Sequence, residues 1–543
     1  MNKQLSFYLD QAIFAVLMIV AGVTPLLFTN LTTDFYETPK LMFLVGSVIL
    51  LYGMWIFSWV SRGKITVQKT PLDVWWMIFL VLVVLSTYLS VSRYPAIFGD
   101  MTRMHGTAIS WVTYILLFFV AVSNLASKDR IKSLLYVLLG SGLVVALVSI
   151  FSYFRLFLPF DFARSVNFTP TGSTFSAAAM LLALIPIPLV SILKPNKFLP
   201  LPIALTLASI FGMTVALIGS TNIYLVMALV FGLSLLSGDT MQVFKRVPLF
   251  LVPVGMTALI MVMGYLPLPG NIFQQTSAGF PREIQLPLGV SWKITASSFR
   301  DAPFFGTGPA TYGFNFTAYK PAEFNNLNYW NVNFDTAYNE LLQILGTLGF
   351  FGFAGLTILL VLIGKLAKSH LKTEGETGWL AISVLVAILL MFFHATTLVS
   401  MVITILLIAA FLMSVPAIRE RSSVLSLGLK ASAADDKQFD LFPILVFVVY
   451  LIAAVPLAFK YYNVVMADFN HRKALAVAGT SGTQTYTYLQ RSEALNPYVD
   501  LYRVDLAQTN FALANAIAGQ ATSSAGLNDE QKQTIQTLLS QAI

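Results

Sequence analysis

The sequence predicts an all-α polytopic membrane protein with about thirteen transmembrane helices, a large external loop and an external helical tail. Two observations support this fold class. Of the 543 residues, 57% are hydrophobic and only 11% are charged, whereas soluble globular chains carry about 25% charged residues. The basic residues also gather in alternate connections between apolar segments, as they do in the cytoplasmic loops of membrane proteins.

Each apolar segment approaches the length of about 20 helical residues that a bilayer core requires. The first segment lacks a small-residue cleavage site and another follows it closely, so we expect a retained helix rather than a signal peptide. The expected transmembrane segments are 12–28, 39–59, 73–90, 109–126, 135–153, 175–193, 199–218, 222–237, 248–266, 338–364, 378–396, 398–416 and 441–459.

The loop charges predict the orientation of these helices. All strongly basic connections fall on one side if the N-terminus is cytoplasmic. Much of the net charge of +8 is then a topology signal, which argues against a nucleic-acid partner. We expect a multi-pass protein of the cell (inner or plasma) membrane, with the large loop and the C-terminus external or periplasmic. The basic residues are Arg62, Lys64, Lys69, Lys128, Arg130, Lys132, Lys194, Lys197, Lys245, Arg246, Lys365, Lys368, Lys372, Arg419, Arg421, Lys430 and Lys437.

Two predicted domains follow: a transmembrane domain over 1–459, with the external loop 267–337, and an external tail over 460–543. In the tail, Ala494-Leu-Asn-Pro497 followed by Tyr498 and Tyr502 resembles the joint of a tetratricopeptide-like helix pair. Such units need stacked neighbours. We therefore expect the tail to pack on the membrane domain or to be the truncated start of a longer array.

The residue types exclude several kinds of site. The chain has no Cys, which rules out disulfides, thiolate metal sites and a Cys nucleophile. Its four His residues are widely spread, so we expect no metal and no cofactor. His394, at the external end of the eleventh segment, is a possible proton carrier or acceptor ligand, or a residue that bonds two helices. His105 beside Arg103 is a weaker candidate.

Basic residues on the external side oppose the charge bias of the loops, which makes them candidates for anion binding. Arg offers a planar fork that matches phosphate oxygens. The alternative is that each is solvated or contacts lipid headgroups. The turn 306–309, Gly-Thr-Gly-Pro, is a further candidate anion cradle or simply a surface turn. The basic candidates are Arg103, Arg164, Lys293 and Arg300, within a set that also includes Arg93, Arg155, Arg282 and Lys320.

The start of the tenth segment is polar. At helical spacing, Asp335, Tyr338 and Asn339 would share one face, and Glu340 would point about 140° away from Asp335. These four are the catalytic candidates. Asp335 could instead cap the helix N-terminus, and Asn339 and Glu340 could be hydrated at the membrane boundary.

Four stretches together resemble the O-antigen ligase and O-antigen polymerase family. They are 292–314 with its Pro-Phe-Phe-Gly-Thr-Gly-Pro turn, 338–352 with its Asn and Gly pair, 98–106 with an Arg before Gly, and 167–172. Some relatives also carry external tetratricopeptide repeats. The chain departs from the family where Tyr338 replaces a frequent His, and where Ser-Thr-Asn at 220–222 replaces a Ser-Arg pair.

The resemblance implies a GT-C-like, metal-independent glycosyltransferase. Such an enzyme moves a glycan from a polyprenyl diphosphate carrier to a lipid, glycan or protein acceptor hydroxyl outside the cytoplasm. Arg103, Lys293 and Arg300, with Arg164 as a further candidate, would hold the diphosphate. Asp335 or Glu340 would orient or deprotonate the acceptor, with Tyr338 and Asn339 lining the site, and Arg300→Ala would abolish transfer.

Three alternatives remain open at this point. The chain could be a polysaccharide polymerase of the same family, a lipid-linked oligosaccharide flippase or other transporter, or a non-catalytic scaffold. We find no repeat of transmembrane segments of the kind frequent in transporters. A cavity lined by Arg103, Arg300 and Asp335 would favour the enzyme, whereas a central path through the bilayer would favour a transporter.

Overall fold

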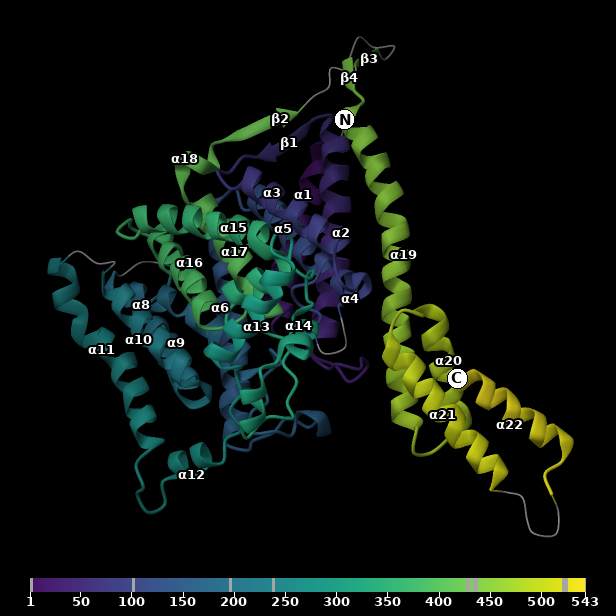
Figure 1. Ribbon diagram of the computed structural model, residues 1–543. Coiled ribbons are helices and arrows are strands. Elements are labelled where there is room, and N and C mark those ends of the chain that lie inside the picture. Colours follow the sequence, from purple (N-terminus) through teal and green to yellow (C-terminus); the bar gives the residue numbers. More distant parts are fainter. Residues whose placement is uncertain are drawn as a thin grey trace. The chain divides into compact units, whose positions relative to one another are not determined.

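The computed structural model describes residues 3–99, 103–194, 198–236, 240–425, 430–432, 438–519 and 526–542 (Figure 1). The chain divides into two compact units. One comprises Met1–Phe28 and Phe43–Val449, and the other comprises Thr29–Met42 and Tyr450–Ile543. The second unit therefore begins before the expected boundary at 459 and includes an N-terminal segment.

Both units are built almost entirely from helices. In chain order, the helices of the N-terminal half are α1 (Lys3–Val23), α2 (Glu37–Arg62), α3 (Asp73–Tyr88), α4 (Arg93–Phe98), α5 (Ala108–Asn124), α6 (Lys128–Tyr153), η1 (Asp161–Ala163), α7 (Thr174–Leu184), α8 (Pro186–Leu193), α9 (Leu201–Ile218), α10 (Thr221–Leu236) and α11 (Thr240–Met263). Those of the C-terminal half are α12 (Ile272–Ala278), α13 (Leu288–Asp301), α14 (Tyr312–Tyr319), η2 (Ala322–Asn326), α15 (Glu340–Ser369), α16 (Glu376–Phe393), α17 (Leu398–Ser414), α18 (Pro416–Arg419), α19 (Phe442–Val477), α20 (Gly482–Leu495), α21 (Asp500–Ala518) and α22 (Asp529–Ala542).

Two short antiparallel ribbons accompany the helices. Strand β1 (Ile65–Gln68) pairs with β2 (Ser422–Leu425), so that Gln68 lies opposite Ser422. Strand β3 (Lys430–Ser432) pairs with β4 (Gln438–Asp440).

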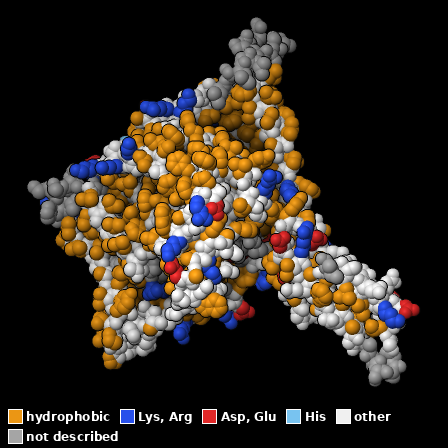
Figure 2. Space-filling view, in the orientation of Figure 1, with side chains coloured by type: hydrophobic (Ala, Val, Ile, Leu, Met, Phe, Trp, Pro, Cys, Tyr) orange, Lys and Arg blue, Asp and Glu red, His pale blue; other side chains and the backbone are white. Residues whose placement is uncertain are grey.

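Within the described residues, nine helices are long and apolar enough to cross a membrane: α1, α2, α6, α7 continued by α8, α9, α11, α15, α16 and α19. Four shorter apolar helices, α3, α5, α10 and α17, coincide with the remaining expected segments. Figure 2 shows hydrophobic side chains over much of the helical surface of the first unit. The helices therefore indicate a protein embedded in a membrane.

The interior of the first unit is formed by α7, α8, α16 and α17. Almost every side chain of α7, α8 and α17 is buried, and so are two thirds of those of α16. Helix α16 packs against α7, α8, α10, α15 and α17. A buried group of apolar helices positions the polar residues that stand at their ends.

Several helix ends differ from the expected ones because of single residues. Helix α1 ends at Val23 instead of residue 28, since Pro25 cannot continue a helix. The expected segment 175–193 is two helices, with Pro186 at the first position of the second.

The start of the tenth segment was predicted wrongly. Helix α15 begins at Glu340, because the Asn339 side chain caps it by accepting from the Leu342 N–H at 2.9 Å. Asp335 and Tyr338 therefore lie in the preceding non-helical segment. The predicted common helix face of Asp335, Tyr338 and Asn339 does not exist, and the cap considered for Asp335 is made by Asn339.

The expected external loop is largely folded. Its helices α13 and α14 share a hydrophobic core with the start of α15, and the core includes Leu286 just before α13 and Ala337 at the end of the loop. The other members are Val290, Ile294, Tyr312, Phe316, Phe324, Phe334 and Leu342. Aromatic side chains therefore make up much of the core that orders this region.

Helix α15 is interrupted at Gly349, whose backbone has φ 65° and ψ −162°. The turn at 303–308 docks there: Phe350 N–H donates to Pro303 O at 2.8 Å, and Gly308 N–H donates to Thr347 O at 2.8 Å. The backbone groups that the interruption frees are thus satisfied by the large loop.

In the second unit, α20 and α21 form a helix pair whose joint includes Asn496 and Pro497, where the sequence suggested one. Helix α22 packs against α21. His471 of α19 is fully buried and bonds Asp505 and Thr33, which ties residues of the N-terminal segment to this unit.

Candidate functional site

A polar cavity of about 510 Å³ lies where helix ends of the first unit meet. It is bounded by the starts of α7 and α10, the end of α9, the residue after α16, and two segments that flank the core of the large loop. The lining residues are Ser173, Thr174, Phe175, Ala178, Ile218, Gly219, Ser220, Thr221, Asn222, Ile223, Arg282, Glu283, Ile284, Gln285, Asp335, Thr336 and His394. These segments are ones that the loop charges predicted to share one side of the membrane.

Arg282 supplies the basic group of this cavity. Its guanidinium donates to Gly219 O, to the Tyr224 hydroxyl at 3.2 Å and to Ser277 Oγ at 3.4 Å. These contacts hold the half-buried side chain at the end of α9, directly before Ser220. Here the resemblance called for an Arg that the local sequence lacks, and Arg282 brings a guanidinium to that place from the large loop.

Glu283, the residue after Arg282, bonds the start of α7. Its carboxylate accepts from the Thr174 N–H, from Thr174 Oγ1 at 3.0 Å and from the Phe175 N–H at 3.4 Å, so it caps the start of α7. Glu283 is exposed to the open cavity, whose walls surround its carboxylate. Desolvation raises the pKa of Glu283, while its hydrogen bonds oppose that rise.

Gln285 and Asn222 connect the two walls of the cavity. Gln285 Nε2 donates to Tyr338 O at 2.6 Å and to Phe393 O at 2.8 Å. Asn222 Nδ2 donates to Gln285 Oε1 at 2.9 Å and to the Tyr338 hydroxyl at 3.1 Å. The two departures from the family pattern, Asn222 and Tyr338, are therefore in contact with each other.

His394 presents one ring nitrogen as an acceptor. Its ring stacks on Phe175 with centroids 3.3 Å apart, and its Nδ1 lies 2.7 Å from Ala395 O. A carbonyl oxygen can only accept, so Nδ1 carries the proton and Nε2 keeps a lone pair. Burial, together with the charge of Arg103, lowers the pKa of His394 to about 4 although the bond to Ala395 opposes the change. The ring is therefore neutral at physiological pH.

Asp335 lines the cavity next to Thr336, at the exit of the large loop. The cavity thus combines one guanidinium, two carboxyl groups and one neutral imidazole with amides and hydroxyls. It could hold an anionic group near Arg282 and a hydroxyl-bearing molecule near His394 and Asp335.

A second polar cluster is buried beside this site. Tyr114 O–H lies 2.7 Å from His105 Nδ1, and His105 Nε2 lies 2.8 Å from Thr396 Oγ1. Thr396 in turn donates its N–H and its hydroxyl to Glu340 Oε2, each at 2.8 Å. Glu340 and His105 are 2% and 1% exposed. Neither lines the cavity, so their direct catalytic roles remain predictions without a geometric basis.

Arg103 belongs to this buried cluster. It is 5% exposed, and its Nε donates to His105 O at 3.0 Å. Burial, and then the Arg103 charge, lowers the pKa of His105 well below its usual value. Arg103 acts electrostatically on His394 but does not line the cavity.

The other predicted phosphate ligands lie elsewhere. Lys293 pairs with Glu323, and Arg300 pairs with the adjacent Asp301 at 3.0 Å. Their side chains are 54% and 75% exposed on α13 and do not line the cavity. Arg164, also exposed, pairs with Asp161 at 3.2 Å. In the turn, Gly306 N–H donates to Ala302 O and Gly308 N–H donates to Thr347 O, so neither N–H is available to an anion.

Neither the family models nor the curated proteins include a match to this chain. Within the described ranges, no group of three or more His, Asp or Glu residues could hold a metal ion.

Sequence reasoning missed Arg282, Glu283, Gln285 and Asn222 as a group. Arg282 is one of the external basic residues, but its local sequence does not distinguish it from the others. The absence of Arg from 220–222 was a usable signal, because it called for a replacement cation from another segment.

Proposed function

We propose that this protein is an O-antigen ligase-like glycosyltransferase that moves a glycan from a polyprenyl diphosphate to an acceptor hydroxyl. In this proposal all thirteen apolar segments cross the bilayer in a GT-C-like arrangement, with the N-terminus cytoplasmic and the cavity facing outward. The observation that supports it is the convergence of Arg282, Asp335 and His394 on one polar cavity at the ends of apolar helices. A polymerase of the same family would use the same groups with a different acceptor.

In the proposed reaction the acceptor oxygen attacks the anomeric carbon as the bond from that carbon to the diphosphate oxygen breaks. The diphosphate leaves with the electron pair and is held by the Arg282 guanidinium. Asp335 orients the acceptor through a second hydroxyl, and the attacking hydroxyl passes its proton to His394 Nε2. Glu340 and Arg103 act behind the cavity, through Thr396 and through the field at His394.

The test supplies labelled polyprenyl-diphosphate glycan to membranes that contain the protein. We expect transfer by the wild type and a loss of about 10²-fold for Asp335→Asn, which keeps the shape of the side chain but removes its charge. The matched control is Asp301→Asn on the exposed end of α13, which should retain transfer. Equal rates for the two variants, or no transfer to lipid, glycan and protein acceptors, would contradict the proposal.

The proposed base also predicts a pH profile. Since the pKa of His394 is about 4, the neutral imidazole persists down to pH 5. Transfer should therefore stay constant from pH 8 to pH 5 and fall as the pH approaches 4, where the ring gains a proton. A profile of initial rates in the same membranes measures this, and a fall centred near 6.5 would show that an ordinary His governs the rate.

A further inference from the structure

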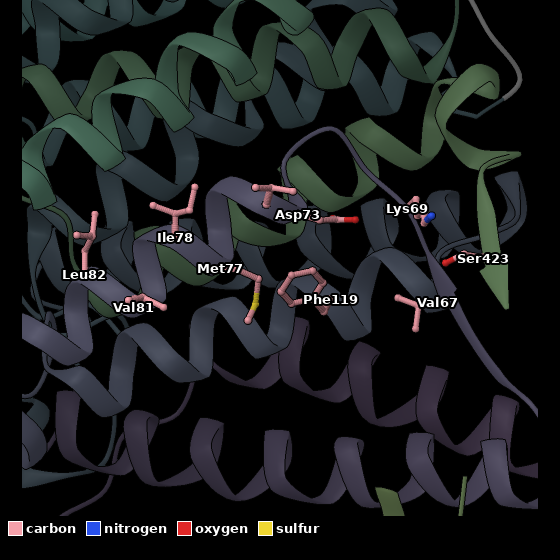
Figure 3. A pocket seen from close by; sticks show the side chains of 10 residues that line it. Val67, Lys69, Asp73, Met77, Ile78, Val81, Leu82, Phe119 and Ser423 are labelled. Carbon is pink, nitrogen blue, oxygen red and sulfur yellow. The ribbon is translucent and has the colours of Figure 1, made fainter. Parts of the chain in front are cut away.

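A second, mainly apolar groove of about 650 Å³ lies along the outer side of α3. Figure 3 shows Lys69 and Ser423 at one end of the row of lining side chains and Leu82 at the other, with Met77 and Phe119 between. The volume lies within the range of about 300–1,000 Å³ that is typical of ligand pockets. The remaining lining residues are Val67, Asp73, Val74, Ile78 and Val81.

The exposed side of helix α3 forms much of this groove, and the opposite side of the helix packs against the protein. Trp76, Phe79 and Val83 of α3 are buried against the protein, whereas Val74 and Val81 are 67% and 54% exposed. With a rise of about 1.5 Å per residue, the stretch from Asp73 to Leu82 is about 14 Å long. Half of a bilayer core of about 30 Å has the same depth, so the groove matches the acyl chain of a lipid in a single leaflet.

The end of the groove at Lys69 is basic. Strands β1 and β2 hold this end, and Lys69 N–H donates to Arg421 O at 2.9 Å. Lys and Arg side chains gather near these strands at the edge of the hydrophobic surface (Figure 2). The Asp73 carboxylate keeps its negative charge, so the excess positive charge at this end comes from Lys69 together with Arg419 and Arg421, whose backbone carbonyls accept from the Gln68 amide of β1.

The opposite end of α3 faces the large loop. There Ser86 Oγ donates to Phe305 O at 2.7 Å, and Val91 N–H donates to Thr307 O at 3.0 Å. The basic end of the groove is therefore remote from the loop that lines the polar cavity. Its occupant is distinct from a substrate of that cavity.

We propose that this groove binds one acyl chain of an anionic glycerophospholipid, with the phosphate beside the Lys69 ammonium. The apolar floor fits the chain, and the basic end selects the negative headgroup. The inference does not depend on the glycan-transfer proposal, because it concerns the other end of α3.

The first test fills the groove. Native mass spectrometry of the purified protein with phosphatidylglycerol should show one retained lipid, and Ile78→Trp should weaken retention at least tenfold. Val84→Trp places the same ring on an exposed position of α3 outside the groove and should change nothing. Equal loss, or equal retention, in the two variants would overturn the proposal.

The second test removes the charge. Lys69→Ala should weaken binding of phosphatidylglycerol about fivefold, the effect of one basic contact at a membrane surface, and leave phosphatidylethanolamine with the same chains unaffected. Lys64→Ala, which removes an exposed Lys at the other end of β1 and outside the lining, is the matched control. Equal affinity of the wild type for the two lipids would overturn the anionic selectivity.

Discussion

Replacement of Arg282 by Ala should lower glycan transfer by about 10²–10³-fold, the usual consequence of removing one preorganised donor from a developing negative charge. Arg282 is the basic side chain that lines the cavity in the described part of the chain, and its contacts with Gly219 O and Tyr224 fix the guanidinium in place. Arg282→Lys keeps the charge but loses the planar fork, so it should recover only part of the activity.

The matched control for Arg282 is Arg300→Ala. The Arg300 side chain is 75% exposed and pairs with its neighbour Asp301, so its loss should leave transfer within about twofold of the wild type. This expectation reverses the one drawn from the sequence. Initial rates with the labelled donor, at equal amounts of monodisperse protein, measure both variants. If Arg300→Ala lowered the rate of transfer more than Arg282→Ala did, the diphosphate would bind at α13 instead of in the cavity.

Gly349→Ala should destabilise the protein by about 3 kcal/mol or more, because two penalties combine. The backbone at Gly349 has φ 65°, which side-chain-bearing residues rarely adopt. A Cβ there would also lie 2.5 Å from Gly306 N and 2.7 Å from Phe304 O. Both contacts are with backbone, which cannot move without undocking the 303–308 turn from α15.

Gly364→Ala in the same helix is the control, because it should not lower the stability of the protein. A Cβ at Gly364 would meet nothing within 4 Å, so the substitution should leave stability unchanged or raise it by up to about 1 kcal/mol. Thermal unfolding in detergent, followed by the fluorescence of the eight Trp residues, compares the two variants. If Gly349→Ala unfolded at the same temperature as Gly364→Ala, the interruption of α15 would not be an obligatory feature of the fold.

Most of the helices could be predicted from sequence because each is a run of apolar residues, and such runs are visible without knowledge of the neighbours. Helix ends depend on single residues and were less certain. Pro25 indicates the end of α1, and Pro186 indicates the break between α7 and α8. Asn339 was not separable from Asp335 as a cap, because both are capping residues before the same apolar run.

The site was only partly predictable. Asp335 and His394 were found because they are polar residues at the ends of apolar segments. Arg282 lies 63 residues from its partner Gly219, and that pairing depends on how helices pack rather than on any local pattern. In sequence, Lys293 and Arg300 are external basic residues like Arg282. In the structure both lie on α13, where their side chains are exposed and pair with acidic residues.

The core of the large loop has a mechanical consequence for the cavity. Leu286 and Ala337 belong to that core, and each directly adjoins a cavity wall, 282–285 on one side and 335–336 on the other. Gln285 ties the two walls by donating to Tyr338 O. Arg282 is held by Gly219 O outside the loop, and Asp335 lies between the core residues Phe334 and Ala337, so the spacing of the guanidinium and the carboxylate depends on the loop remaining folded.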